Sequence, residues 1–551
     1  MVPASALYTA LRAAKLLDNT QINDTWIHQG KECGLWECLI DSELVPYETL
    51  RDFLRKEYGT PEVDISEVLI TKEIISMIPY ETAVRYTILP VFTEKNRLIL
   101  AMKNPFDFDA LNDALMCAPI PPVPRLARAK DIKHYISKFY AQSHISTIAS
   151  QFIVEENLKS GKYPKELDTD IHSAPAVKLI DSLIDTAVHS NASDIHIEPF
   201  ENLLRTRYRI DGRLTVFQNV DKSLHPNIIA RLKVMGRMIL DEKRRPQDGS
   251  FQSCYDGANI DFRLSTMPTA RYGEKAVIRI MYNSAPMRKH ELGFLPQDLE
   301  KINELFKRTG GLVLVTGPTG SGKNTTLTAF LEELNTVDVN IVTIEDPVEN
   351  VLYGVNQVSV RPRHGLDFAD VLRSALRQDP DIIMLGEIRD LETATSAIRA
   401  AMTGHFVLST LHTNDAASAV VRLVEMGVPR YLVGSTVKGV LHQQLARRLC
   451  EACKTEETLG PERAALLGAP EGTKVYKPAG CHRCGNTGYS GRFALCEVFI
   501  MDDDLRAVIN ENGTREEIKS VAKMTALWEN AREHVLLGHT SIEEVERFLH
   551  E

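Results

Sequence analysis

A run of nine residues has the pattern of a phosphate-binding loop, with two glycines ahead of a lysine and a metal-binding position. Glycines at these positions let backbone N–H groups close around a phosphate, and the lysine reaches the β- and γ-phosphates. An asparagine stands where a hydroxyl usually binds Mg²⁺, which leaves the efficiency of hydrolysis open. The pattern predicts binding of a nucleoside triphosphate. The run consists of Gly317, Pro318, Thr319, Gly320, Ser321, Gly322, Lys323, Asn324 and Thr325.

The surrounding sequence predicts the elements that position this loop. The apolar run 312–315 predicts a buried strand ahead of it, and residues 325–330 can open a helix whose N-terminus faces the anion. Three further apolar runs, 341–344, 381–385 and 406–411, also end in polar residues. In open α/β sheets ligands bind beyond the carboxyl ends of the strands. We therefore expect the four strand ends to converge on one phosphate site.

Acidic residues and a histidine follow three of these strands. Glu345, Asp346 and Glu349 could act at a metal or form a solvated turn, and the residues alone leave both interpretations open. Glu387 follows four apolar residues and a glycine, which argues against an ordinary surface charge. Metal binding or water activation needs a carboxylate of this kind. His412 ends the last strand, where a histidine is more often structural than functional.

Two arginines lie four residues apart on the predicted helix 368–378, which Asp379 and Pro380 end. Arg373 and Arg377 therefore share one face of the helix. They could bond local carboxylates, or they could reach a phosphate in this chain or across a subunit boundary. The spacing favours neither interpretation.

Four cysteines form two C-x₂-C pairs separated by residues 454–480. Two such pairs predict a closed tetrahedral site of four thiolates, the arrangement that structural Zn²⁺ prefers. Because the protein supplies all four ligands, no open coordination position remains and we assign no catalytic role. The cysteines are Cys450, Cys453, Cys481 and Cys484.

The 551-residue chain has an ordinary globular composition, with 44% hydrophobic and 25% charged residues. Its net charge of −10 disfavours a general nucleic-acid binder. No apolar run approaches the roughly 18 residues of a membrane-spanning helix, and the first residues lack the apolar core of a signal peptide. We therefore expect a cytosolic protein whose cysteines are reduced.

Composition and periodicity divide the chain into several parts. In the last part helices alternate with apolar strands, which is typical of an α/β domain with a mainly parallel sheet. The expected parts are helical residues 1–60, a small α+β domain at 61–141, a linker at 142–173, a domain of one helix and short strands at 174–285, and an α/β domain at 286–551 that includes the cysteine insert 450–484 and carboxy-terminal helices over 497–551.

These motifs together resemble those of the secretion ATPase superfamily, in particular the type II secretion and type IV pilus assembly ATPases. The loop corresponds to Walker A, residues 344–349 to the Asp box, 377–390 to Walker B and 403–416 to the His box, in the order found in the family. The resemblance covers roughly residues 60–551. Three segments resemble the middle domain of the family: 192–199, 207–212 and 245–249.

The resemblance implies an α/β fold with a RecA-like P-loop ATPase core, a PAS-like middle domain, a small α+β amino-terminal domain and a zinc-knuckle insert. It implies a cytoplasmic homo-hexamer at the inner face of the cell membrane. There ATP hydrolysis would turn a membrane platform protein and add pilin-like subunits to a filament. The implied cofactors are ATP, Mg²⁺ and structural Zn²⁺. The cysteine insert is similar to that of assembly-type ATPases, which retraction-type ATPases generally lack.

The resemblance also implies roles for single residues. Arg207 and Arg209 match arginines of the middle domain that help to hold the phosphates. Glu387 matches the Walker B glutamate, which is the expected catalytic base. The remaining implied roles fall on the Asp-box acids Glu345 and Glu349, which would position Mg²⁺ and water, and on His412, which would sense the γ-phosphate.

The domain at 61–141 resembles the small amino-terminal domain of the family, which in some members binds cyclic di-GMP through an R-L-G-x-x-L helix. The nearest stretch, residues 34–45, has Gly34 at the arginine position and Trp36 and Glu43 at the two glycine positions. Because these phosphate-facing groups are missing, we expect no cyclic di-GMP binding. We expect instead that the domain docks onto a membrane-anchored partner.

A phosphate-binding loop of this kind is compatible with two other classes of function. The interpretation that the chain is a weakly hydrolysing scaffold or regulator of the same machinery stays open because of Asn324. A DNA translocase is disfavoured by the negative net charge and by the family boxes. The sequence does not distinguish pilus assembly from protein secretion.

Overall fold

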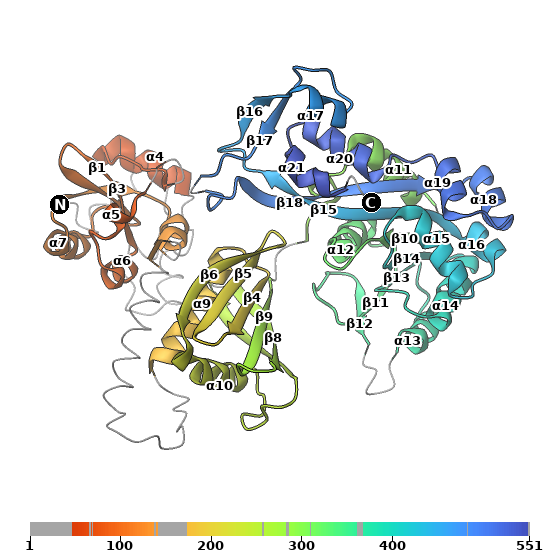
Figure 1. Cartoon of the computed structure of the whole chain (residues 1–551), viewed down its shortest axis with the longest axis horizontal. Helices are drawn as coiled ribbons and strands as arrows, with labels where there is room; N and C mark the ends of the chain where they lie inside the picture. Colours follow the sequence, from red (N-terminus) through yellow and green to blue (C-terminus); the bar gives the residue numbers. More distant parts are fainter. Residues whose placement is uncertain are drawn as a thin grey trace. The chain divides into compact units, whose positions relative to one another are not determined.

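The computed structural model of the chain divides into two units, Met1–Met281 and Tyr282–Glu551, which are described separately (Figure 1). Two stretches used in the sequence predictions, 34–45 and 142–173, lie outside the described residues. None of the described helices is both long and apolar enough to cross a membrane. The described residues are 47–65, 68, 70–136, 139–140, 174–255, 258–282, 286–308, 310–360, 367–481 and 483–548.

A three-stranded sheet forms the centre of the amino-terminal part. Strands β1 (Ile88–Glu94) and β2 (Arg97–Met102) run antiparallel around a turn, and β3 (Pro122–Leu126) runs parallel to β2. The turn bends at Lys95 and Asn96, whose φ angles are positive. The helices of this part are α4 (Tyr47–Tyr58), α5 (Lys72–Ile75), α6 (Tyr80–Tyr86) and α7 (Phe108–Cys117).

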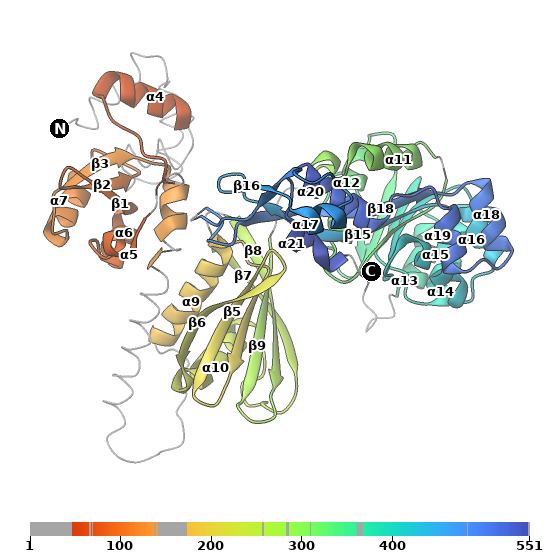
Figure 2. The same cartoon turned by 45° about the horizontal axis from the view of Figure 1, so that its top comes forward.

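A six-stranded antiparallel sheet in the order β6-β5-β4-β9-β8-β7 follows in the same unit (Figure 2). Alternation along β5 buries Leu204 and Tyr208 on one face and leaves Arg207 and Arg209 on the other. Helix α9 covers the apolar face, where the Tyr208 hydroxyl donates to the carbonyl oxygen of Leu183 at 2.7 Å. The elements are α9 (Ala174–His189), β4 (Asp194–Pro199), β5 (Leu203–Ile210), β6 (Arg213–Asp221), η2 (Lys222–Leu224), α10 (His225–Met235), β7 (Gln247–Tyr255), β8 (Ala258–Pro268) and β9 (Glu274–Met281).

The second unit contains a seven-stranded sheet in the order β12-β11-β13-β14-β10-β15-β18. Its first six strands are parallel, and β18 runs antiparallel to β15. The four strands predicted from apolar runs are neighbours, as expected. The strands are β10 (Gly311–Thr316), β11 (Ile341–Glu345), β12 (Asn356–Ser359), β13 (Ile382–Leu385), β14 (Phe406–Leu411), β15 (Val437–Leu449) and β18 (Tyr489–Ile500).

Helices cover both faces of this sheet, so its central strands are apolar on both sides. Along β10, Leu312 and Leu314 enter a core shared with α13, α14 and α15, whereas Val313 and Val315 enter a core shared with α11 and α12. This explains why the strand appears in the sequence as a continuous apolar run. The helices are η3 (Lys289–Glu291), α11 (Pro296–Phe306), α12 (Lys323–Leu334), α13 (Phe368–Ala375), α14 (Leu391–Met402), α15 (Ala416–Glu425) and α16 (Arg430–Thr436).

Strands β15 and β18 are long and form a ribbon with the cysteine insert at one end (Figure 1). The insert contains β16 (Thr455–Thr458), α17 (Pro461–Leu466) and β17 (Lys474–Lys477). Residues 497–500 complete β18, so the carboxy-terminal helices begin later than the sequence suggested. The α/β fold class predicted for the chain is confirmed. The last helices are α18 (Asp503–Asn510), α19 (Arg515–Val521), α20 (Leu527–Leu536), α21 (Ile542–Val545) and η5 (Glu546–Phe548).

Candidate nucleotide site and metal centre

The phosphate-binding loop connects the end of β10 to the start of α12. Gly317, Gly320 and Gly322 adopt φ angles of 146°, 81° and 83°, which L side chains rarely adopt. A Cβ atom at Gly317 would also collide with the backbone carbonyl oxygen of Gln443. The two glycines that define the motif are therefore required by the backbone itself, before any phosphate is considered.

Lys323 begins α12 and points its ammonium into the loop. Its Nζ donates to the carbonyl oxygens of Gly317 and Pro318 at 2.9 and 3.0 Å, and the residue is only 8% exposed. Burial lowers the pKa of Lys323, and the charge of Glu387 acts in the opposite direction. The ammonium is thus held at the loop by two neutral acceptors, which phosphate oxygens could replace.

Glu387 and His412 meet at the carboxyl ends of the adjacent strands β13 and β14. One carboxylate oxygen of Glu387 lies 3.5 Å from Nε2 of His412, and the other contacts the guanidinium of Arg389. Arg389 also lies 3.9 Å from a carboxylate oxygen of Asp346, which follows β11. The predicted convergence of the strand ends is therefore present. Arg389 is a member of this cluster that the sequence analysis did not single out, although it lies within the Walker B box.

The two Asp-box glutamates have different surroundings. Glu345 accepts hydrogen bonds from the Thr343 hydroxyl at 2.6 Å and the Gln357 side-chain nitrogen at 3.0 Å. Glu349 faces the loop instead, since the Nδ2 of Asn324 donates to its carboxylate at 3.4 Å. Glu349 is thus the Asp-box acid that lies beside Asn324, which stands at the metal-binding position of the loop pattern. Glu345 is hydrogen-bonded instead to residues of strands β11 and β12.

Helix α13 ends at Ala375, earlier than the predicted 378, so Arg373 lies on the helix and Arg377 lies just beyond it. Both arginines bond nearby groups. Arg373 forms ion pairs with Glu392, at 2.8 Å, and with Asp370. Arg377 donates to the carbonyl oxygen of Arg373 at 2.9 Å and to the Ser374 hydroxyl at 3.2 Å. Local pairing, one of the two interpretations left open by the sequence, therefore describes Arg373 in this chain. Binding of a phosphate by either arginine stays a prediction.

Arg207 and Arg209 belong to the other unit, on the polar face of its six-stranded sheet. Arg207 donates to the Glu198 carboxylate at 2.6 Å, and Arg209 donates to the carbonyl oxygen of Gly212 at 2.9 Å. Burial would raise the pKa of Glu198, but hydrogen bonds from Arg207, Arg205 and a lysine lower it to about 2. Glu198 therefore stays ionised and holds Arg207 in an extended position on the face.

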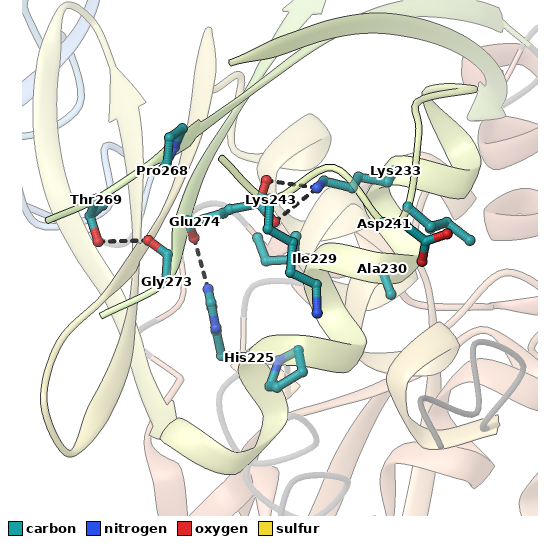
Figure 3. Close-up of a pocket in the computed structure, with 12 residues that line it drawn as sticks. His225, Ile229, Ala230, Lys233, Asp241, Lys243, Pro268, Thr269, Gly273 and Glu274 are labelled. Carbon is teal, nitrogen blue, oxygen red and sulfur yellow. Dashed lines mark hydrogen bonds and ion pairs between the residues drawn. The ribbon is translucent and has the colours of Figure 1, made fainter. Parts of the chain in front are cut away.

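A cavity of about 380 Å³ opens in the same unit between α10 and the turn that joins β8 to β9 (Figure 3). The buried ammonium of Lys233 closes one side, where it lies 2.7 Å from a Glu274 carboxylate oxygen and donates to the carbonyl oxygen of Glu242. His225 bonds the backbone carbonyl of Glu274 at 2.7 Å. These polar groups satisfy one another, which explains how a lysine and a glutamate come to be buried here.

The four cysteines of the insert come together as the sequence predicts. The sulfur atoms lie 3.9 Å apart for Cys450 and Cys481 and 3.8 Å apart for both Cys453–Cys484 and Cys481–Cys484. A tetrahedron with Zn–S bonds of about 2.3 Å has edges of about 3.8 Å. The four ligand atoms lie within 4.8 Å of one another, so the donor set fits zinc.

Backbone donors support thiolate charge in this cluster. The N–H groups of Cys481 and Gly488 both donate to the sulfur of Cys484 at 3.2 Å. Burial raises the pKa of Cys484, but these hydrogen bonds outweigh it and bring the value to about 7. Cys484 is therefore held toward the deprotonated form in which cysteine binds metal, whereas burial raises the pKa of both Cys450 and Cys453.

The phosphate-binding loop, a carboxylate and a histidine lie at the carboxyl ends of neighbouring parallel strands. Together with the four-cysteine insert, this arrangement defines a P-loop ATPase of the α/β class. Residues 169–547 match the family model described as "Type II/IV secretion system protein", and residues 58–146 match that of the MshEN domain. The chain belongs to the type II secretion and type IV pilus assembly ATPase family.

Curated relatives agree with this assignment. The chain is 40% identical over 524 residues to the type IV pilus assembly ATPase PilB of Thermus thermophilus, covering 93% of this chain but only 58% of that protein. It is 39% identical over 473 residues to the type II secretion system protein E of Xanthomonas campestris, covering 84% of this chain and 83% of that protein. The ATPase DotB of Legionella pneumophila, at 22% identity, shares the fold with a TM-score of 0.51 over 71% of this chain and 98% of that one.

Proposed function

We propose that this chain is a cytoplasmic, homo-hexameric ATPase that powers type IV pilus assembly or type II protein secretion. The observation that carries the proposal is the meeting of Lys323, Glu387 and His412 at the ends of neighbouring parallel strands. Such an arrangement suits an ATP whose phosphates lie in the loop and whose γ-phosphate faces a carboxylate. The two pathways come from the names of the relatives.

Binding of ATP would use the loop and its lysine. The ammonium of Lys323 would exchange the carbonyl oxygens of Gly317 and Pro318 for phosphate oxygens. Mg²⁺, when bound, would neutralise charge between the β- and γ-phosphates. Asn324 and Glu349 would hold it. Because the Nδ2 of Asn324 faces Glu349, its amide oxygen is the atom left for the metal, and an amide oxygen is a hard ligand of the right kind.

Hydrolysis would use Glu387 as the general base. Its carboxylate contacts the guanidinium of Arg389 through one oxygen and faces His412 through the other. Water activated in this way would attack the γ-phosphorus while the bond to the β–γ bridging oxygen breaks and ADP leaves, and a proton of the water would pass to Glu387. His412, half exposed and 3.5 Å from Glu387, lies where it could contact the γ-phosphate and report its loss.

The remaining parts of the chain would link this chemistry to an assembly. Arg207 and Arg209 lie partly buried on the polar face of the six-stranded sheet, from which they would help to hold the phosphates. The domain matched at 58–146 would dock onto a membrane-anchored protein, and the ring would act on a membrane platform protein. The four-cysteine site would hold zinc as a structural ion.

Phosphate release from the purified full-length protein tests the proposal. We expect wild type to hydrolyse ATP and Lys323→Ala to lose binding or turnover, because the cation that offsets γ-phosphate charge is gone. Lys474→Ala is a matched control, since this lysine is exposed on the insert and forms an ion pair with nearby Glu456. Equal phosphate release from wild type and Lys323→Ala would contradict the proposal.

A further inference from the structure

Gln443 lies against the phosphate-binding loop although it follows the loop by more than a hundred residues. It stands on β15 next to His442, which pairs with Thr316 at the end of β10. Its side-chain nitrogen donates to the carbonyl oxygen of Ser321 at 2.6 Å, and its side-chain oxygen accepts from the Thr326 hydroxyl at 2.8 Å. Gln443 is 1% exposed, so both bonds are shielded from water. The amide therefore joins the loop to the first turn of α12.

The bond to Ser321 sets the orientation of one peptide plane in the loop. In a trans peptide the C=O and N–H groups point in opposite directions. With the carbonyl of Ser321 turned toward Gln443, the N–H of Gly322 turns away from β15 and toward the hollow of the loop. Backbone N–H groups that face such a hollow are the groups that bind phosphate.

The backbone of β15 also packs closely against the loop. The carbonyl oxygen of Gln443 occupies the space that a Cβ atom at Gly317 would need, and its side-chain nitrogen would lie 3.2 Å from a Cβ atom at Gly322. The close approach of β15 thus excludes a side chain at Gly317 and crowds one at Gly322, in addition to the constraint from their φ angles. Replacing the amide would leave a buried carbonyl and a buried hydroxyl without this partner, which proteins avoid.

We propose that Gln443 is a positioning residue for nucleotide binding, which holds the loop in its phosphate-binding form before the nucleotide arrives. The inference rests on the proposed function of the loop. Gln443 acts through Ser321 and Thr326 and makes its contacts from the side of β15. Its loss should therefore weaken the binding of any nucleotide with a β-phosphate, raising KM more than it lowers kcat.

The test measures the Kd of ADP for the full-length protein by fluorescence titration, without turnover. Gln443→Leu removes both bonds, and Gln443→Glu keeps the acceptor for Thr326 but loses the donor to Ser321. We expect the Kd to rise by about ten- to a hundredfold in both variants. Gln444→Leu is the matched control, because successive side chains of a strand point to opposite faces, and it should keep the wild-type Kd.

A second readout concerns the nucleotide-free protein. Amide hydrogen exchange of residues 320–323 should be faster in Gln443→Leu than in wild type, while exchange in the strands of the sheet stays the same. If Gln443 had a purely structural role, its replacement would speed exchange in the loop and in the strands together. The Kd of the folded protein would then stay the same.

The outcomes separate the two proposals. A wild-type protein that binds no ADP overturns the proposed function and this inference with it. Wild-type binding together with an unchanged Kd in folded Gln443→Leu overturns this inference alone. If Gln443→Leu does not fold, Thr326→Val decides in its place, because it removes one of the two bonds. We then expect a rise in Kd of about threefold or more, and an unchanged Kd overturns the inference.

Discussion

Glu387 lies between the guanidinium of Arg389 and the imidazole of His412, which fix the direction of its carboxylate. We predict that Glu387→Gln keeps ATP binding and loses turnover, since an amide cannot accept the proton of the attacking water. General base catalysis contributes about 10²–10⁴-fold, so phosphate release should fall by that factor. Glu392→Gln is a matched control, because Glu392 pairs with Arg373 on the surface. Full activity in Glu387→Gln would exclude it as the base.

Asn324 is the residue at which this chain departs from the usual loop. Its amide is longer than a serine hydroxyl, and its Nδ2 is directed to Glu349 rather than to a metal. We predict that Asn324→Ser raises ATPase activity at sub-millimolar Mg²⁺, by about tenfold if about 1.4 kcal/mol of transition-state stabilisation returns. A titration of phosphate release against Mg²⁺ measures this. Superimposable curves for the two proteins would mean that the asparagine is neutral.

At the scale of secondary structure, the sequence predicted the strands whose side chains are apolar on both faces. Strands β10, β11, β13 and β14 are of this kind, and the loop and the cluster of Glu387, Arg389 and His412 follow their ends. The sequence analysis did not predict β7 or β15. Residues alternate between partly buried and exposed along β7, and β15 contains several polar residues, so neither forms a continuous apolar run.

The polar residues of β15 are buried because they have partners that no local pattern reveals. Gln443 bonds residues more than a hundred positions earlier in the chain, and His442 bonds the Thr316 hydroxyl. The loop and cysteine pairs were predictable because their chemistry is confined to short motifs. Arg389 and Gln443 were not, since their significance depends on which strands become neighbours.

His442 supplies a test of the contact between β10 and β15. Burial lowers its pKa from 6.5 to about 4, so the folded state resists protonation that the unfolded state accepts. The contribution of neutral His442 to the free energy of unfolding is therefore fully present above pH 6.5 and decreases as the pH falls toward 4. Relative to His442→Asn, wild type should lose about 2 kcal/mol of unfolding free energy between about pH 7.5 and about pH 5. Denaturant unfolding at both pH values measures the difference, and parallel losses in the two proteins would contradict it.

The cysteine insert should respond to metal as a separate element. We predict about one Zn²⁺ per chain by metal analysis, because the four sulfurs form a closed tetrahedral set. Cys453→Ser should lose the metal and make residues 450–484 sensitive to protease, while ADP binding at the loop remains. Cys254→Ser is the control, since this cysteine is exposed in the other unit. Unchanged protease resistance in metal-free protein would contradict a structural zinc.

At the scale of the whole molecule, the candidate phosphate-binding groups are divided between two units. The loop lies in one, and Arg207 and Arg209 lie in the other. We predict a hexamer that nucleotide tightens, because a ligand that binds the assembled state stabilises it by mass action. Light scattering at micromolar protein with a non-hydrolysable ATP analogue should show the hexamer, and Arg207→Ala should weaken its dependence on nucleotide. Monomer alone under these conditions would contradict the prediction.

Strand β15 has Gln443 against the phosphate-binding loop and leads directly into Cys450 of the cysteine cluster. About seven residues of extended chain separate the two, a span of roughly 23 Å. Strand β15 pairs with β18 along this length, with a register shift between Arg447 and Leu449. A paired stretch of this kind is stiffer than a single extended chain. The ribbon is thus a continuous hydrogen-bonded connection between the loop and the cysteine end. In the motor proposed above, the stiffness of this connection would set how much of a movement at the loop reaches the cysteine cluster.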